Sequence, residues 1–146
     1  MYGVDTSGWA EMLLDFSDAR VYPAVPLQPL CPPRQTVCMD VAIPPNMVIK
    51  RGTVMSESST RGTFIPYDGT LQARGLLKFD AWSDATGLVT VDGPYVSWPQ
   101  LQYLVVPVYL IGEFATNFLI GLTDAAVRDM GRILRGNLAD GVLELR

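Results

Sequence analysis

Three short apolar runs separated by glycines fill residues 48–80 and constrain the fold more than any other part of the chain. The runs lie within residues 48–55, 63–67 and 76–79, and each has the length and the β-branched or aromatic content of one strand. A glycine between strands supplies a positive φ for a turn, whereas a glycine inside a strand marks a bulge or a close backbone approach. The pattern therefore predicts a small, tightly bent sheet. The glycines that would bend it are Gly52, Gly62, Gly69 and Gly75.

Further strands are expected downstream of this stretch. Residues 88–92 (LVTVD) read as one strand, and residues 104–111 form an apolar run typical of a strand buried on both faces. Residues 112–114 (GEF) are expected to turn the chain, and a second apolar run follows at 117–122.

The clearest helix is expected at residues 123–135. Thr123 is a favourable N-cap, and apolar residues recur on one face up to Leu134. Gly131 inside this helix would cost about 1 kcal/mol relative to alanine, which suggests a close packing contact. Gly136 is the expected C-terminal stop, and residues 142–145 are expected to form a last strand.

The N-terminal third has a different character. Residues 1–18 offer one short amphipathic helix, capped by Ser7, that would dock on the chain's own domain or on a partner. Residues 22–45 contain most of the chain's prolines and should run extended. We therefore expect two parts: an arm at 1–45 and a β-rich domain at 46–146.

The proline-free run at residues 35–43 has β character, so it can pair with a sheet edge. It is either a strap on its own domain or an arm that adds a strand to a neighbouring subunit or partner; its many apolar side chains favour the second reading. The expected arm contacts are Val37, Met39, Val41 and Ile43. On this reading, Asp at position 41 or 43 would weaken attachment to the partner and leave the protein folded.

Composition argues against several function classes. The chain has no histidine and two cysteines, Cys31 and Cys38, so it lacks the usual structural zinc set and the commonest general base. The cysteines are expected to be reduced, partly buried thiols. Several carboxylates sit in turn contexts, where Asp usually shapes the backbone. We expect no enzyme activity, no metal and no cofactor. The carboxylates in these turn contexts are Asp68, Asp80, Asp84, Asp92 and Glu113.

Charge and hydropathy address nucleic acids and membranes. A net charge of −4 lacks the basic field that phosphate binding needs. Arg128, Arg132 and Arg135 read as a solvated helix face. The most apolar run is too short to span a bilayer and contains Pro107. We therefore expect neither nucleic acid nor a membrane as a partner.

Three motifs follow one another within residues 48–80: IKRGTVM at 49–55, GTFIP at 62–66 and ARGLLKFD at 73–80. With VPVYLIGEF at 106–114 and the terminal helix and strand, this order resembles the lambda head protein D-like family of bacteriophage head decoration proteins. The resemblance covers about the C-terminal two thirds of the chain. Two features depart from the family pattern: the arm is longer and richer in proline, and residues 81–104 have no clear counterpart.

The resemblance implies a mainly β fold, a small bent sheet of β-clip or β-tulip type with one C-terminal helix. It implies a homotrimer that binds the major capsid protein lattice at threefold positions on the outside of the mature capsid and stabilises it. Such a protein would be assembled in the host cytoplasm and located on the virion. Gly52, Gly62 and Gly75 would set the bends of the sheet. The expected core residues are Val54, Phe64, Ile65, Leu76 and Leu77.

An alternative function rests on an aromatic cluster at residues 95–103. Tyr95, Trp98 and Tyr103 could stack on a carbohydrate, which would make the chain a monomeric β-rich binding module. The same residues could equally fill a core or a subunit interface.

Overall fold

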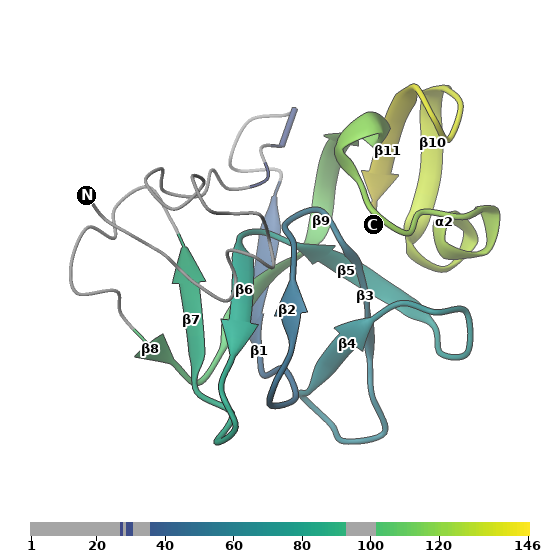
Figure 1. Ribbon diagram of the computed structural model, residues 1–146. Helices are drawn as coiled ribbons and strands as arrows, with labels where there is room; N and C mark the ends of the chain where they lie inside the picture. Colours follow the sequence, from purple (N-terminus) through teal and green to yellow (C-terminus); the bar gives the residue numbers. More distant parts are fainter. Residues whose placement is uncertain (1–26, 28, 31–35, 93–101) are drawn as a thin grey trace.

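The computed structural model describes residues 27, 29–30, 36–92 and 102–146. This part of the chain is mainly β, with one α-helix and a curled sheet (Figure 1), as the sequence predicts. The expected N-terminal helix at residues 1–18 lies outside the described residues.

The strands form a seven-stranded and a four-stranded sheet. The larger sheet contains β1 (Val37–Val41), β3 (Val54–Glu57), β4 (Phe64–Pro66), β5 (Ala73–Leu77), β9 (Val106–Ala115), β10 (Gly131–Gly136) and β11 (Gly141–Leu145). The smaller sheet contains β2 (Val48–Ile49), β6 (Asp80–Ser83), β7 (Val89–Asp92) and β8 (Gln102–Tyr103). A 3₁₀ helix, η3 (Thr116–Phe118), and the helix α2 (Asp124–Met130) join β9 to β10.

The larger sheet closes on itself. Its strand order is β10-β11-β9-β5-β3-β4, and β1 pairs with β9 beside this path. Just after β1, the Ala42 N–H donates to the Gly62 carbonyl (2.9 Å) and the Phe64 N–H donates to the Ala42 carbonyl (2.8 Å). The chain that leaves β1 thus reaches the start of β4, at the far end of the path, and the sheet curls into a ring.

The central strands of this sheet are buried on both faces, which explains why β3 and β5 are largely apolar. One face packs against the smaller sheet, and the other packs against α2 and Leu27. The first core contains Val41, Ile43, Ile49, Met55, Phe64, Leu77, Ala81, Val89, Val91, Val106 and Val108. The second contains Leu27, Val54, Ala73, Leu76, Tyr109, Phe114, Ala126, Met130, Leu143 and Leu145.

The bending glycines take two forms. Gly52 and Gly62 have φ of 82° and 83°, a left-handed conformation that favours glycine. Gly75 is instead inside β5, where an added Cβ would meet the Tyr109 carbonyl oxygen of β9. Gly69 also has a positive φ, 93°, so three of these glycines serve turns and Gly75 lets two backbones approach.

Four of the five predicted core residues are fully buried: Val54, Phe64, Leu76 and Leu77. The prediction for Ile65 is wrong, because this side chain is only partly buried. Successive side chains of a strand point to opposite faces, and in β4 Phe64 takes the inner one.

The predicted boundary between arm and domain falls too late in the chain. β1 pairs with β9 over Val37 to Val41, so the sheet begins before residue 45. Val41 and Ile43 are 1% and 4% exposed, in the first core. Their assignment as contacts to a capsid lattice is therefore wrong: residues 37–43 form a strand of their own domain. Contact with the domain begins before β1, because the Leu27 N–H donates to the Lys78 carbonyl.

The predicted helix is too long. Thr123 caps α2 as expected, its Oγ1 accepting from the Ala126 N–H (3.1 Å), but the helix ends at Met130. Residues 131–136 form β10, which pairs with β11. A Cβ at Gly131 would meet the Glu144 carbonyl oxygen. The close contact expected at this glycine is thus made by a strand.

The turn predicted at residues 112–114 is also absent, because β9 runs through to Ala115. Gly112 has a φ of 151°, and it lies opposite Leu145 of β11. The final strand pairs along these residues and keeps them extended.

Candidate functional site

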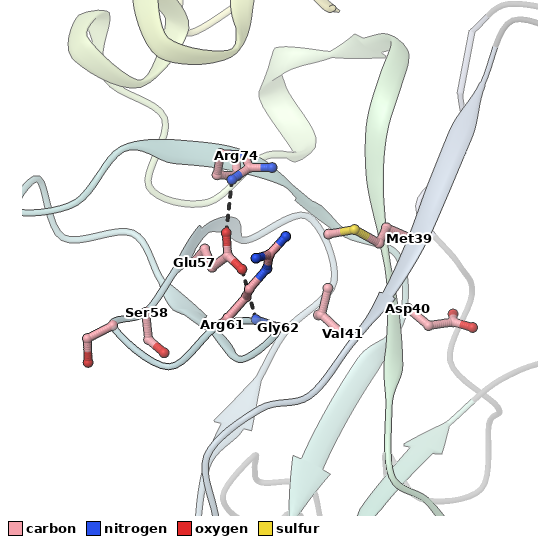
Figure 2. A pocket seen from close by; sticks show the side chains of 9 residues that line it. Met39, Asp40, Val41, Glu57, Ser58, Arg61, Gly62 and Arg74 are labelled. Carbon is pink, nitrogen blue, oxygen red and sulfur yellow. Dashed lines mark hydrogen bonds and ion pairs between the residues drawn. The ribbon is translucent and has the colours of Figure 1, made fainter.

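A hollow of about 530 Å³ lies where β1 separates from the β3–β4 hairpin (Figure 2). It combines two arginines, two carboxylates and two serines with the side chain of a methionine. Its lining residues are Met39, Asp40, Val41, Glu57, Ser58, Ser59, Arg61, Gly62 and Arg74.

A bulge in β5 presents Arg74 to this hollow. Met55 of β3 lies opposite Gly75 and Ser56 lies opposite Ala73, so Arg74 is the extra residue. Arg74 is exposed, while its neighbours in β5 are buried. An unpaired residue in a bulge re-aims its side chain, and here the guanidinium is directed outward.

The tight turn from β3 to β4 presents Arg61. Ser58 shapes this turn, because its Oγ accepts from the Thr60 N–H (3.1 Å) and donates to the Thr60 carbonyl. The positive φ of Gly62 then returns the chain to β4. Arg61 therefore stands at a defined corner of the hairpin.

Glu57 organises the hollow. Its Oε2 accepts from the Gly62 N–H (2.8 Å), and its Oε1 forms an ion pair with Arg74 Nη1 (3.0 Å). The Gly62 hydrogen bond, with a smaller contribution from Arg74, holds the pKa of this carboxyl below its ordinary value of 4.5. Glu57 is thus ionised at neutral pH and braces both the turn and the bulge.

Arg61 keeps its hydrogen-bonding groups available. Among the described residues it forms no ion pair, although its charge contributes to the lowered pKa of Glu57. Figure 2 shows its guanidinium between Glu57 and Met39, while the carboxylate of Asp40 points away from the arginines. A guanidinium presents a planar fork of donors that suits a carboxylate. The hollow can therefore bind a carboxylate that has an apolar neighbour.

The structure places the predicted arm residues differently from one another. Val37 is exposed, at 45%, and Met39 is partly buried at the hollow. Val41 also borders the hollow, but its side chain belongs to the core, as does that of Ile43.

Sequence reasoning missed the four charged residues that line the hollow: Asp40, Glu57, Arg61 and Arg74. A signal was present, because each arginine directly precedes a glycine, Gly62 or Gly75. Glycines bend the chain at these places, so the preceding side chains project from a turn and a bulge.

Most of the predicted aromatic cluster falls in the range 93–101, outside the described residues. Tyr95 and Trp98 lie outside the described residues, and only the backbone of Tyr103, in β8, is described.

Two of the turn carboxylates act as expected. Asp68 Oδ1 accepts from the Thr70 N–H (3.0 Å) and hydroxyl (2.6 Å), and Asp84 Oδ1 accepts from Thr86 in the same way. In each case the threonine hydroxyl contributes most to lowering the pKa of the aspartate. Both side chains shape turns.

Within the described ranges, no cluster of three or more Cys, Asp or Glu side chains could hold a metal ion. In the same part of the chain, no helix combines the length and apolar character needed to cross a membrane. Cys38 is a free thiol and is exposed, whereas the sequence predicted partial burial. Cys31 lies outside the described residues.

Several exposed apolar side chains lie on backbone that is fixed by hydrogen bonds to neighbouring segments. Two of them, Phe118 and Ile120, are 67% and 46% exposed and lie close together in the chain. The Ile120 N–H donates to the Gly52 carbonyl and its carbonyl accepts from the Val54 N–H, both at 2.9 Å. Val37 and Ile111 form a second exposed pair, directly opposite each other on β1 and β9. Apolar groups held in this way are suited to a protein interface.

Comparisons with protein-family models, with curated proteins and with solved structures each found no match to this chain.

Proposed function

We propose that this protein is a structural component of a virion: a trimeric decoration protein that binds the exterior of a mature phage capsid and stabilises it. The observation that carries the proposal is the order of the sequence motifs together with their place in the sheet. The motif segments include β3, β4, β5 and β9, which are neighbours in the order β9-β5-β3-β4. The resemblance thus concerns one continuous part of the fold.

The exposed apolar side chains support a partner-binding role. Phe118 and Ile120 lie on a segment hydrogen-bonded to Gly52 and Val54, so binding there would cost little backbone ordering. We assign this segment to the contact between subunits of the trimer.

Contacts to the capsid lattice are reassigned. Val37 and Met39 stay in the proposal, because they are exposed and partly exposed on β1. Val41 and Ile43 are removed, since the domain's own core holds them. Lattice stabilisation would follow from mass action, because a protein that binds only the mature shell favours that state.

The first test is the native mass of the full chain by light scattering, together with co-sedimentation with expanded shells of the coat protein from the same source. A mass three times that of the 16.0 kDa chain and saturable sedimentation with the shells are expected. Phe118→Asp should lower the mass and leave the circular dichroism spectrum unchanged; Leu71→Asp, another exposed apolar position, is the matched control. A monomer that stays in the supernatant would contradict the proposal and direct attention to the aromatic cluster.

A further inference from the structure

We propose that the hollow between β1 and the β3–β4 hairpin binds the acidic N-terminal segment, residues 1–20, of the same chain. The carboxylates of the segment would bind Arg61 and Arg74, and its apolar side chains would pack beside Met39. This contact is independent of the proposed function, because it forms within one molecule.

The charge of the chain is distributed unevenly. Residues 1–20 carry four carboxylates and one arginine, a net charge of −3, whereas the other 126 residues carry eleven carboxylates and ten cations, a net charge of −1. Most of the net negative charge therefore belongs to this segment. Its carboxylates are Asp5, Glu11, Asp15 and Asp18.

The hollow offers arginines to these carboxylates. Its own two carboxylates are Glu57, which is paired with Arg74, and Asp40, whose side chain points away from the arginines (Figure 2). Arg61 has no ion-pair partner among the described residues, and Arg74 shares only one carboxylate, that of Glu57. Beside them, Met39 is partly buried and packs on the first core. A flexible thioether adapts to different apolar partners. The segment alternates carboxylates with such partners, including Met12, Leu13 and Phe16.

The segment is long enough to reach the hollow. Leu27 is attached to the domain, through its N–H to the Lys78 carbonyl and its carbonyl to the Tyr109 hydroxyl (3.0 Å). Asp18 precedes Leu27 by nine residues, which can span about 30 Å when extended. A domain of this size is about 35 Å across. A tether of this length gives an effective concentration in the millimolar range, so weak ion pairs suffice for binding within one chain.

Site-specific photocrosslinking of the full chain tests the contact. Ser59, at the edge of the hollow, is replaced by the photoreactive residue p-benzoylphenylalanine. Ala85, exposed in the turn between β6 and β7, is replaced in the same way as a control. Irradiation of mixed ¹⁵N-labelled and unlabelled protein, followed by mass spectrometry, identifies the crosslinked peptide and shows whether one chain or two supplied it. We expect position 59, and not position 85, to crosslink to residues 1–20 of the same chain.

A charge reversal tests the role of the arginine. Arg61→Glu in the Ser59 photoreactive protein should reduce the crosslink to residues 1–20 about fivefold, the size of a modest surface ion-pair effect. Arg135→Glu makes the same charge change on β10, away from the hollow, and should leave the yield unchanged. The proposal is overturned if residues 1–20 do not crosslink to position 59, if they crosslink only between chains, or if both reversals act equally.

Discussion

β1 and β10 are both strands that local sequence assigned elsewhere, the first to an arm and the second to a helix, yet different forces hold them. β1 ends in Val41, which is fully buried, and Ile43 follows it into the same core. β10 buries little of its side-chain surface, and it approaches β11 closely at Gly131, where a Cβ would meet backbone. Apolar burial thus anchors one strand and close backbone packing positions the other.

The largest effect is expected from a substitution of the buried side chain that anchors β1 in the core. Val41→Asp places a charge without a partner in the first core and should lower the free energy of unfolding by more than about 4 kcal/mol. Val37→Asp, at an exposed position of the same strand, is the control and should change it by less than about 0.5 kcal/mol. Urea denaturation followed by circular dichroism measures both. If Val41→Asp were folded and as stable as its control, β1 would not belong to the core.

The ionisation of Tyr109 tests the part of β9 that lies between β1 and the β10–β11 hairpin. It lies opposite Cys38 of β1, and its ring packs on Phe114, 4.8 Å between centroids, which lies opposite Leu143 of β11. Burial raises the pKa of Tyr109 from 10.0 to about 12. The unfolded phenol ionises first, so the stability linked to this group is intact below pH 10 and is lost as the pH rises toward 12.

The expected loss is up to about 3 kcal/mol at pH 12, at 1.36 kcal/mol for each unit of pKa. Tyr109→Phe cannot ionise, so its stability should fall less over the same pH window, although it loses about 1 kcal/mol at neutral pH with the hydrogen bond to Leu27. Urea midpoints of the two proteins between pH 8 and 12 make the comparison. Parallel pH profiles would show that the phenol of Tyr109 does not carry the effect.

Gly131→Ala tests the close packing of β10. The added Cβ would meet the Glu144 carbonyl oxygen, which is backbone and cannot rotate away, so we expect a loss of about 2 kcal/mol. Leu134→Ala, an exposed position on the same strand, should cost about 0.5 kcal/mol or less. If alanine at 131 were neutral or stabilising, residues 131–135 would suit the helix that local sequence predicts.

The smallest effect concerns the ion pair on the β10–β11 hairpin. Arg132 Nε lies 2.8 Å from Glu144 Oε1, and the arginine side chain is more than half exposed. Solvent screens such a pair, so Arg132→Gln should change stability by about 0.5 kcal/mol or less. A double-mutant cycle with Glu144→Gln isolates the pairwise energy. A coupling well above 1 kcal/mol would mean that side chains, as well as backbone, hold β10.

The short strands around the glycines of residues 48–80 were predictable from local pattern. The run at residues 63–67 contains β4, and the run at 76–79 supplies the end of β5. The run at 48–55, predicted as one strand, instead forms β2 and the start of β3, which lie in different sheets. Of the candidate site, Met39 and Val41 were predicted as contact residues, but the hollow was not, because Arg61, Arg74 and Met39 come from three separate segments. Only the curled sheet brings them to one hollow.

Fold class, the positions of most strands and the cap of α2 follow from local sequence, because glycine, β-branched residues and Thr123 act on the backbone within a few residues. The ends of elements did not follow in the same way. Residues 131–135 have helical apolar spacing and residues 112–114 resemble a turn, yet both are extended in the sheet. Residues 35–43 were expected to be extended, but local sequence did not decide that β1 pairs with β9 of its own domain. Pairing with strands distant in the chain decided them, since backbone hydrogen bonds and core burial across the sheet outweigh local preferences of about 1 kcal/mol.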